Sequence, residues 1–297
     1  MVSGGAVSDL LIAVCVKWTD LRPEIDPLHG TVETRSHGSG ISESDLAAVE
    51  VALGTASIWS AAASEDGADA VPVVVVCAGP VQAEESLREL FAVGVSRVVR
   101  LDMAEQAPSA EVAASLAAVL SSDELGADLV VCGDVSSDRG SGSVPAFLAH
   151  ELGAAQALGL IAVTAGATGE LAALRRLDGG RRERLAVTTP AVVSVEGSVA
   201  QLRRASLAAT LAAKQAKVEV SSTRTPAPVD TVRLRPWRPR PRVLAPPTGA
   251  SALDRIVQLT GAFVDRTPPR TLVLDPDAAA DAVLEQLAAW GYLDDAS

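Results

Sequence analysis

The sequence is short of cysteine, histidine and long apolar segments, and each shortage excludes a class of protein. It has three cysteines and three histidines in 297 residues, and none is spaced as a metal ligand or as part of a disulfide framework. The amino-terminal residues lack a basic region, and the apolar run from Leu10 to Val16 is far too short to span a bilayer. We therefore expect a cytoplasmic protein with no membrane insertion.

Basic residues and common catalytic motifs are also scarce. The formal net charge is -12, and nucleic-acid binding requires clustered lysine and arginine, so we expect no nucleic-acid partner. The sequence lacks the G-x-S-x-G turn of hydrolases, the Lys-Ser/Thr ending of a Walker A loop and a G-x-G-x-x-G fingerprint after its first strand. His29, His37 and His150 are scattered, so no catalytic constellation is predicted.

Aliphatic runs instead alternate with alanine-rich segments of helical periodicity. The predicted strands span residues 10–16, 73–77, 97–101 and 129–132, with another after Pro190. Residues 83–93 are predicted to form an amphipathic helix that ends at Gly94, and Leu21 to Gly40 a polar, turn-rich insertion. Glu170 to Val187 is predicted to be a hairpin that turns at Asp178-Gly179-Gly180. Continuous aliphatic strands between amphipathic helices predict an α/β fold with a doubly wound, mostly parallel, Rossmann-type sheet.

The segment from Cys132 to Pro145 is the most informative part of this pattern, because it reads as strand, glycine-rich loop and helix. Gly133, Gly140 and Gly142 allow tight turns, and free amides at the helix start can face a phosphate or another anion. A plain connection of small residues explains the loop equally well. Cys15, Cys77 and Cys132 each close an aliphatic run, which places three strand ends around one predicted crevice.

Five short matches in a constant order, from Leu11 to about Val220, resemble the β subunit of electron transfer flavoproteins. They are Cys15-Val16-Lys17; Gly79-Pro80 with Leu87-Arg88, Gly94 and Arg97; the loop and helix Gly133 to Leu152 with its acid Asp138; Arg176 to Val193; and Leu202 to Leu207 with Lys214 to Lys217.

The resemblance implies a partner and cofactors. Residues 1–220 would form a nucleotide-binding domain with an adenine nucleotide α-hydrolase-like fold, and this domain would pair with an α subunit. FAD, held mainly by α, would carry electrons from a dehydrogenase to a quinone reductase or similar acceptor. The β subunit of the family also buries AMP. By the same resemblance, the cofactor-binding residues here are Cys15, Ser42, Glu43, Ser44, Ala78, Gly133, Asp134, Asp138, Arg139, Gly140, Ser141, Gly142, Ser143 and Val144.

One motif departs from the family. Asn-Pro-Phe-Asp/Cys-Glu, which contributes to the AMP site, is replaced by Ile41 to Asp45, and Glu43 and Asp134 add negative charge near the expected phosphate. AMP, a second FAD and an empty crevice all stay open. Two other functions also stay open: an ATP-using enzyme in which Ser141 and Ser143 hold phosphates, and a nonredox scaffold subunit.

The last part of the chain has a different composition. Residues 221–297 are predicted to form a Pro/Arg-rich arm and two short helices, 251–260 and 277–290, that dock on the partner subunit. By resemblance, Leu207 anchors the dehydrogenase and Trp18 to Arg22 lie near the isoalloxazine ring. The predicted partner-binding residues are Arg203, Arg204, Ser206, Leu207, Leu211 and Trp237. From the Ala/Arg-rich composition we expect an actinobacterial paralogue, associated with mycofactocin-dependent dehydrogenases.

Overall fold

The computed structural model describes residues 10–26, 28–29, 31–33, 38–65, 70–104, 107–221, 246–261 and 271–290. The chain divides into two units, Met1–Trp237 and Arg238–Ser297. Each unit is described by itself below. Trp237, His37 and most of the predicted Pro/Arg-rich arm lie outside the described residues.

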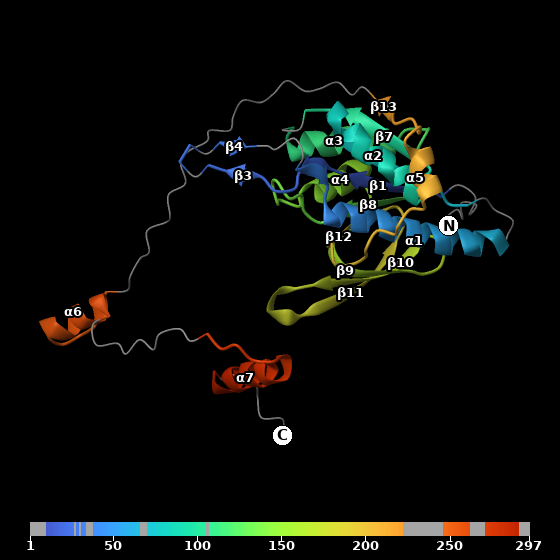
Figure 1. The fold of residues 1–297 in the computed structure, drawn as a ribbon. Helices are drawn as coiled ribbons and strands as arrows, with labels where there is room; N and C mark the ends of the chain where they lie inside the picture. Colours follow the sequence, from blue (N-terminus) through green and yellow to red (C-terminus); the bar gives the residue numbers. More distant parts are fainter. Residues whose placement is uncertain are drawn as a thin grey trace. The chain divides into compact units, whose positions relative to one another are not determined.

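A nine-stranded sheet organises the first unit, in the order β11-β10-β9-β12-β8-β1-β6-β7-β13 (Figure 1). Strand pairs from β9 through β12 to β13 are parallel, and only β9, β10 and β11 pair antiparallel. The predicted mostly parallel sheet is therefore confirmed. The strands are β1 (Ile12–Val16), β6 (Val73–Gly79), β7 (Arg97–Asp102), β8 (Leu129–Gly133), β9 (Ala155–Ala165), β10 (Glu170–Arg176), β11 (Arg182–Thr188), β12 (Ala191–Val195) and β13 (Glu219–Ser221).

Helices cover both faces of this sheet, as a doubly wound fold requires. All five residues of β1 are buried, and alternate side chains enter two separate apolar cores. One core is closed by α1 (Glu43–Glu65), α2 (Glu84–Glu89) and the 3₁₀ helix η3 (Leu90–Val93). The other is closed by α3 (Ser109–Leu120) and α4 (Val144–Leu152).

The helix expected over residues 83–93 is divided in the structure. A 3₁₀ turn, η2 (Val81–Ala83), precedes α2, and the last turn tightens into η3. Gly94 ends the segment with a φ of 110°, a left-handed conformation that glycine adopts at low cost. The predicted capping residue is thus confirmed, although the helix before it is not uniform.

The hairpin is confirmed with its turn. Gly179 and Gly180 have φ values of 68° and 73°, and Arg175 lies opposite Glu183 in the antiparallel register. The Arg175 guanidinium donates to the Glu183 carboxylate at 2.5 and 3.0 Å. This half-buried ion pair joins β10 and β11 far along the sheet from β1.

Two strand pairs lie outside the main sheet, one at the ends of the predicted polar insertion, residues 21–40, and one inside it. β2 (Trp18–Asp20) pairs antiparallel with β5 (Ser39–Ile41), and β3 (Glu24–Ile25) pairs with β4 (Val32–Glu33). Lys17 alone separates β1 from β2.

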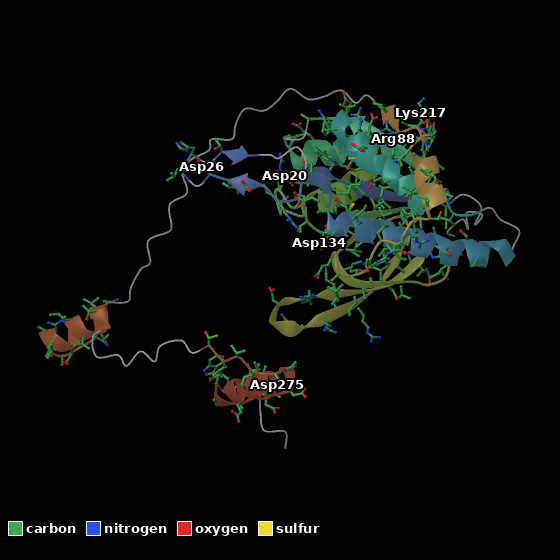
Figure 2. All side chains as sticks on the ribbon, viewed as in Figure 1. Asp20, Asp26, Arg88, Asp134, Lys217 and Asp275 are labelled. Carbon is green, nitrogen blue, oxygen red and sulfur yellow. The ribbon has the colours of Figure 1, made fainter. Side chains whose placement is uncertain are left out.

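Residues 246–261 and 271–290, the described part of the second unit, contain two helices, both predicted from sequence. α6 (Ala252–Thr260) begins with a capping box in which the Ser251 hydroxyl accepts from the Asp254 amide at 3.1 Å. α7 (Pro276–Ala289) is capped by Asp275, whose carboxylate accepts from the Ala278 amide at 3.0 Å (Figure 2).

Within the described ranges, no helix has both the length and the apolar character needed to cross a membrane.

Candidate functional site

A cavity lies at the carboxyl ends of β1, β6 and β8. The chain passes from β1 to β6 and β7 and then returns to β8 on the other side of β1, so the cavity is at the point where strand order reverses, the usual ligand position in such sheets. Its empty volume is about 810 Å³, including open solvent at its mouth.

Nine of the predicted cofactor-binding residues line this cavity, and five do not. Those that line it are Cys15, Ala78, Gly133, Asp134, Arg139, Ser141, Gly142, Ser143 and Val144. Those that do not are Ser42, Glu43, Ser44, Asp138 and Gly140. Lys17 and Asp45 line it without having been predicted to.

The segment from Ser42 to Ser44 lies behind the cavity wall. Glu43, the first residue of α1, is exposed to solvent, whereas both serines are buried. The two serine hydroxyls are 3.1 Å apart, and that of Ser44 donates to the carbonyl of Val135 at 3.1 Å. Ser44 therefore connects the start of α1 to the loop that follows β8.

Asp45 joins the ends of two strands at the cavity floor. One carboxylate oxygen accepts from the Lys17 amide at 3.0 Å, and the other from the Gly133 amide at 3.2 Å. Burial raises the pKa of Asp45 to about 6, although these two amides and Ser42 oppose the rise. The floor of the cavity is thus held by a carboxylate that titrates near neutral pH.

Lys17 carries the next ionic contact at the cavity. Its ammonium lies 2.5 and 2.7 Å from the two carboxylate oxygens of Asp138. Burial alone would raise the pKa of Asp138, but hydrogen bonds and the charge of Lys17 hold it below its ordinary value. The sequence feature that could have pointed to Lys17 is its position as a lone lysine directly after a buried strand.

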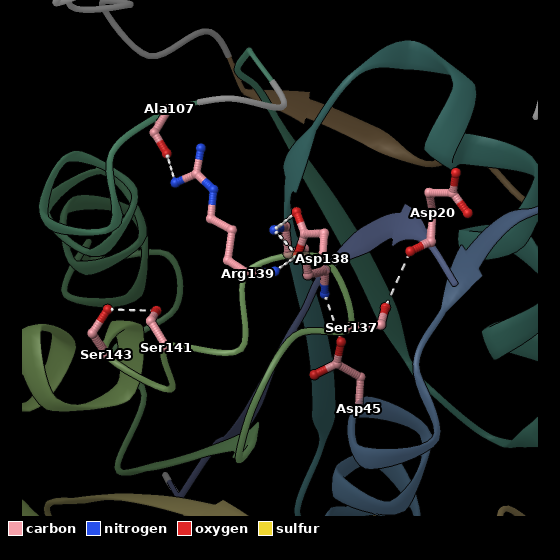
Figure 3. A network of polar contacts seen from close by, with 9 residues as sticks. Asp20, Asp45, Ala107, Ser137, Asp138, Arg139, Ser141 and Ser143 are labelled. Carbon is pink, nitrogen blue, oxygen red and sulfur yellow. Dashed lines mark hydrogen bonds and ion pairs between the residues drawn. The ribbon is translucent and has the colours of Figure 1, made fainter. Parts of the chain in front are cut away.

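The start of α4 carries the groups best suited to an anion. Ser143 is the N-cap residue, its side chain makes no capping bond, and its hydroxyl lies 3.0 Å from that of Ser141 (Figure 3). The Arg139 guanidinium lines the cavity and donates to the carbonyl of Ala107 at 2.9 Å. Gly142 has a φ of 58°, and a Cβ there would lie 2.7 Å from the carbonyl oxygen of Asp134.

One carboxylate opposes an anion at this place. Asp134 lines the cavity, and burial, with the charge of Glu196, raises its pKa above the ordinary value although the Val135 amide lowers it. Two hydroxyls and the Arg139 side chain stand against Asp134 near the start of α4, while the second lining carboxylate, Asp45, accepts from the Lys17 and Gly133 amides. These residues fit a phosphate group.

The three cysteines divide between the two sheet faces. Cys15 and Cys132 are partners in the β1–β8 register and line the cavity, whereas Cys77 enters the opposite core. A hydrogen bond with Cys132 and burial raise the pKa of the Cys15 thiol well above its ordinary value, and burial raises that of Cys77 to about 12. Both thiols are poor nucleophiles. No metal-binding cluster of His, Cys, Asp or Glu occurs within the part of the chain that the structure describes.

Five of the six predicted partner-binding residues, all but Trp237, lie on and before α5 (Leu207–Ala213). Ser206 caps this helix by accepting from the Ala209 amide at 3.1 Å. Leu207 and Leu211 are 76% and 56% exposed, one helical turn apart. Arg203 instead forms an ion pair with Glu50 of α1 at 2.8 Å, which ties the segment to the domain, while Arg204 is exposed.

The fold and cavity thus define an α/β protein of the nucleotide-binding type, and comparison with known proteins gives its family. The Electron transfer flavoprotein domain matches residues 30–225. The Electron transfer flavoprotein subunit beta of Chromohalobacter salexigens is 31% identical over 208 residues, which cover 69% of this chain and 74% of that protein. Its counterpart in Syntrophomonas wolfei is 29% identical over 215 residues (72% and 80%), and that of Mycobacterium tuberculosis is 33% identical over 150 residues (50% and 55%). The chain belongs to the electron transfer flavoprotein family and resembles its β subunits.

Proposed function

We propose that this chain is the β subunit of a heterodimeric electron transfer flavoprotein. It pairs with an α subunit that holds most of the FAD, and the complex carries electrons from a dehydrogenase to a quinone reductase or similar acceptor. The observation that supports this most is the β-subunit similarity over 208 residues. FAD, when bound, supplies the redox chemistry, and this chain supplies geometry and electrostatics.

The cavity at the strand ends is the proposed nucleotide site of this subunit. The amides and hydroxyls of Ser141 and Ser143, with the Arg139 guanidinium, would hold a phosphate at the start of α4. Cys15 and Ala78 give the same cavity an apolar wall, which suits an adenine ring. AMP is therefore the proposed occupant, with a role in stabilising the domain.

The exposed leucines of α5 are the proposed contact for the electron donor. Leu207→Glu is expected to lower kcat/KM for reduction of the flavin by the donor dehydrogenase about tenfold. The reason is that a charged side chain replaces the leucine that would be buried against the donor. Steady-state reduction of the purified heterodimer measures this. Ile58→Glu, at an exposed apolar position of α1, is the matched control. Equal losses in both variants would contradict the assignment.

We propose that residues 1–220 are the nucleotide-binding domain and residues 221–297 a docking arm for the α subunit. In α6, Leu253, Ile256 and Val257 follow the i, i+3, i+4 pattern of a helix that enters a groove, and the first two are exposed. Arginines crowd the sequence before α6, so an acidic rim around that groove would complement them.

The α6 proposal predicts a loss of subunit affinity. Leu253→Asp with Ile256→Asp is expected to weaken the heterodimer at least about tenfold, because two apolar anchors become charged. Gln258→Asp adds a charge on the polar face of the same helix and should leave affinity unchanged. Surface plasmon resonance with immobilised α subunit gives both values. A double variant that binds like the wild type would remove α6 from the interface.

A further inference from the structure

Strand β2 directly follows Lys17, which lines the cavity. It has three residues, packs Trp18 against the apolar core and, within the described residues, pairs with the three residues of β5. Thr19 and Asp20 are buried, yet the Thr19 Oγ1 and Asp20 Oδ2 atoms have no hydrogen-bond partner. Because a buried polar atom without a partner is costly, both atoms would gain from moving into water. Other contacts must therefore keep β2 in place.

The loop that follows β8 supplies two of those contacts. The Ser137 hydroxyl donates to the carbonyl oxygen of Asp20 at 3.2 Å (Figure 3). Asp138 holds the ammonium of Lys17, the residue that joins β1 to β2. Two neighbouring side chains of one loop thus reach both ends of β2.

The same loop lines the cavity on its other side. Its beginning is fixed, since the Gly133 amide donates to Asp45 and the Asp134 amide donates to the carbonyl of Val195 at 3.0 Å. Its later residues, from Arg139 to Ser143, face the cavity except for Gly140. A ligand in the cavity therefore touches the residues that directly follow Ser137 and Asp138.

We propose that Ser137 and Asp138 are positioning residues that fix β2 against the loop, and that a nucleotide in the cavity restrains β2 through them. The positioning half stands on the contacts of this chain alone. The nucleotide half rests on the proposed function, in which the cavity takes AMP and β2 lies on the flavin side of the subunit.

Hydrogen–deuterium exchange of the complete heterodimer tests the positioning half. In the variant Ser137→Ala/Asp138→Asn, the amides of residues 18–20 are expected to exchange about tenfold faster than in the wild type. Glu183→Gln removes the ion pair with Arg175 in the distant hairpin and should leave these amides unchanged. Asp138→Glu, paired with native Ser137, should restore slow exchange. Unchanged exchange at residues 18–20 in the double variant overturns the proposal.

AMP and the flavin supply two further readouts. AMP is expected to slow exchange of β2 in the wild type but not in the double variant, while calorimetry shows AMP bound to both. Asp138→Asn leaves the charge of Lys17 uncompensated, so the midpoint potential of FAD should rise, and Glu183→Gln should not move it. Equal slowing by AMP in both proteins overturns the nucleotide half, as does absence of AMP binding to the wild type. A chain that purifies without flavin or partner contradicts the proposed function, and exchange on that chain alone still decides the positioning half.

Discussion

Replacing Gly133 by alanine is expected to lower the free energy of unfolding by about 3 kcal/mol, near the upper end of the usual cost of overpacking. A Cβ at this position would lie 2.5 Å from Asp45 Oδ1, 2.7 Å from the Ser44 hydroxyl and 3.0 Å from the Asp45 amide nitrogen. These atoms are buried, and they hold α1 to β8. The added methyl group must push α1 away or break those hydrogen bonds.

Gly54 provides the matched control for this substitution. It lies inside α1, and a Cβ there would meet nothing within 4 Å. Gly54→Ala is therefore expected to stabilise the chain by about 0.5–1 kcal/mol, because alanine favours the helix. Urea unfolding followed by circular dichroism measures both variants. If Gly133→Ala unfolds at the same urea concentration as the wild type, the close approach of α1 to β8 is not as described.

Asp45→Asn is expected to change how stability depends on pH. The pKa of Asp45 in the folded chain, about 6, lies above its ordinary value of 3.8. The folded state therefore holds a proton that the unfolded chain releases between these values. The stabilisation from this proton is complete below pH 3.8 and is lost as the pH rises through 6. A pKa difference of this size corresponds to about 3 kcal/mol of unfolding free energy.

Asparagine has no such proton to lose, so the variant keeps its stability as the pH rises. From about pH 4 to pH 7.5, the difference in unfolding free energy between variant and wild type should shift toward the variant by about 3 kcal/mol. Other carboxylates titrate in both proteins and cancel in this comparison. Denaturant unfolding at the two pH values measures the shift. The same difference at both pH values would show that Asp45 does not titrate near neutrality.

Much of the architecture could be predicted because local chemistry and fold agree. β1, β6, β7 and β8 are aliphatic runs buried on both faces, and Asp178-Gly179-Gly180 marks a hairpin. β9 and β13 were not predicted. β9 is rich in alanine, and β13 has three residues whose place beside β7 is supported by the Arg97–Glu219 ion pair at 2.6 Å. Such a long-range pair leaves no local trace in the sequence.

The candidate site could be predicted in position more than in detail. The strand–loop–helix pattern from Cys132 to Pro145 pointed to the cavity that the structure contains. Asp45 and Lys17 were not singled out, because their roles depend on contacts 88 and 121 residues away along the chain. The exposed position of Glu43, beside the buried Ser42 and Ser44, follows from where α1 begins. The sequence resemblance alone does not show which of these three residues is exposed.

Native mass spectrometry of the tagged chain, purified from its own host, tests the central claim most directly. We expect a heterodimer in which a partner of similar size accompanies one FAD and one AMP. Dissociation in the gas phase should release this chain and the partner separately, which identifies the α subunit by mass. A monomer without flavin, or a chain that turns over ATP without any partner, would contradict the assignment as an electron-carrying β subunit.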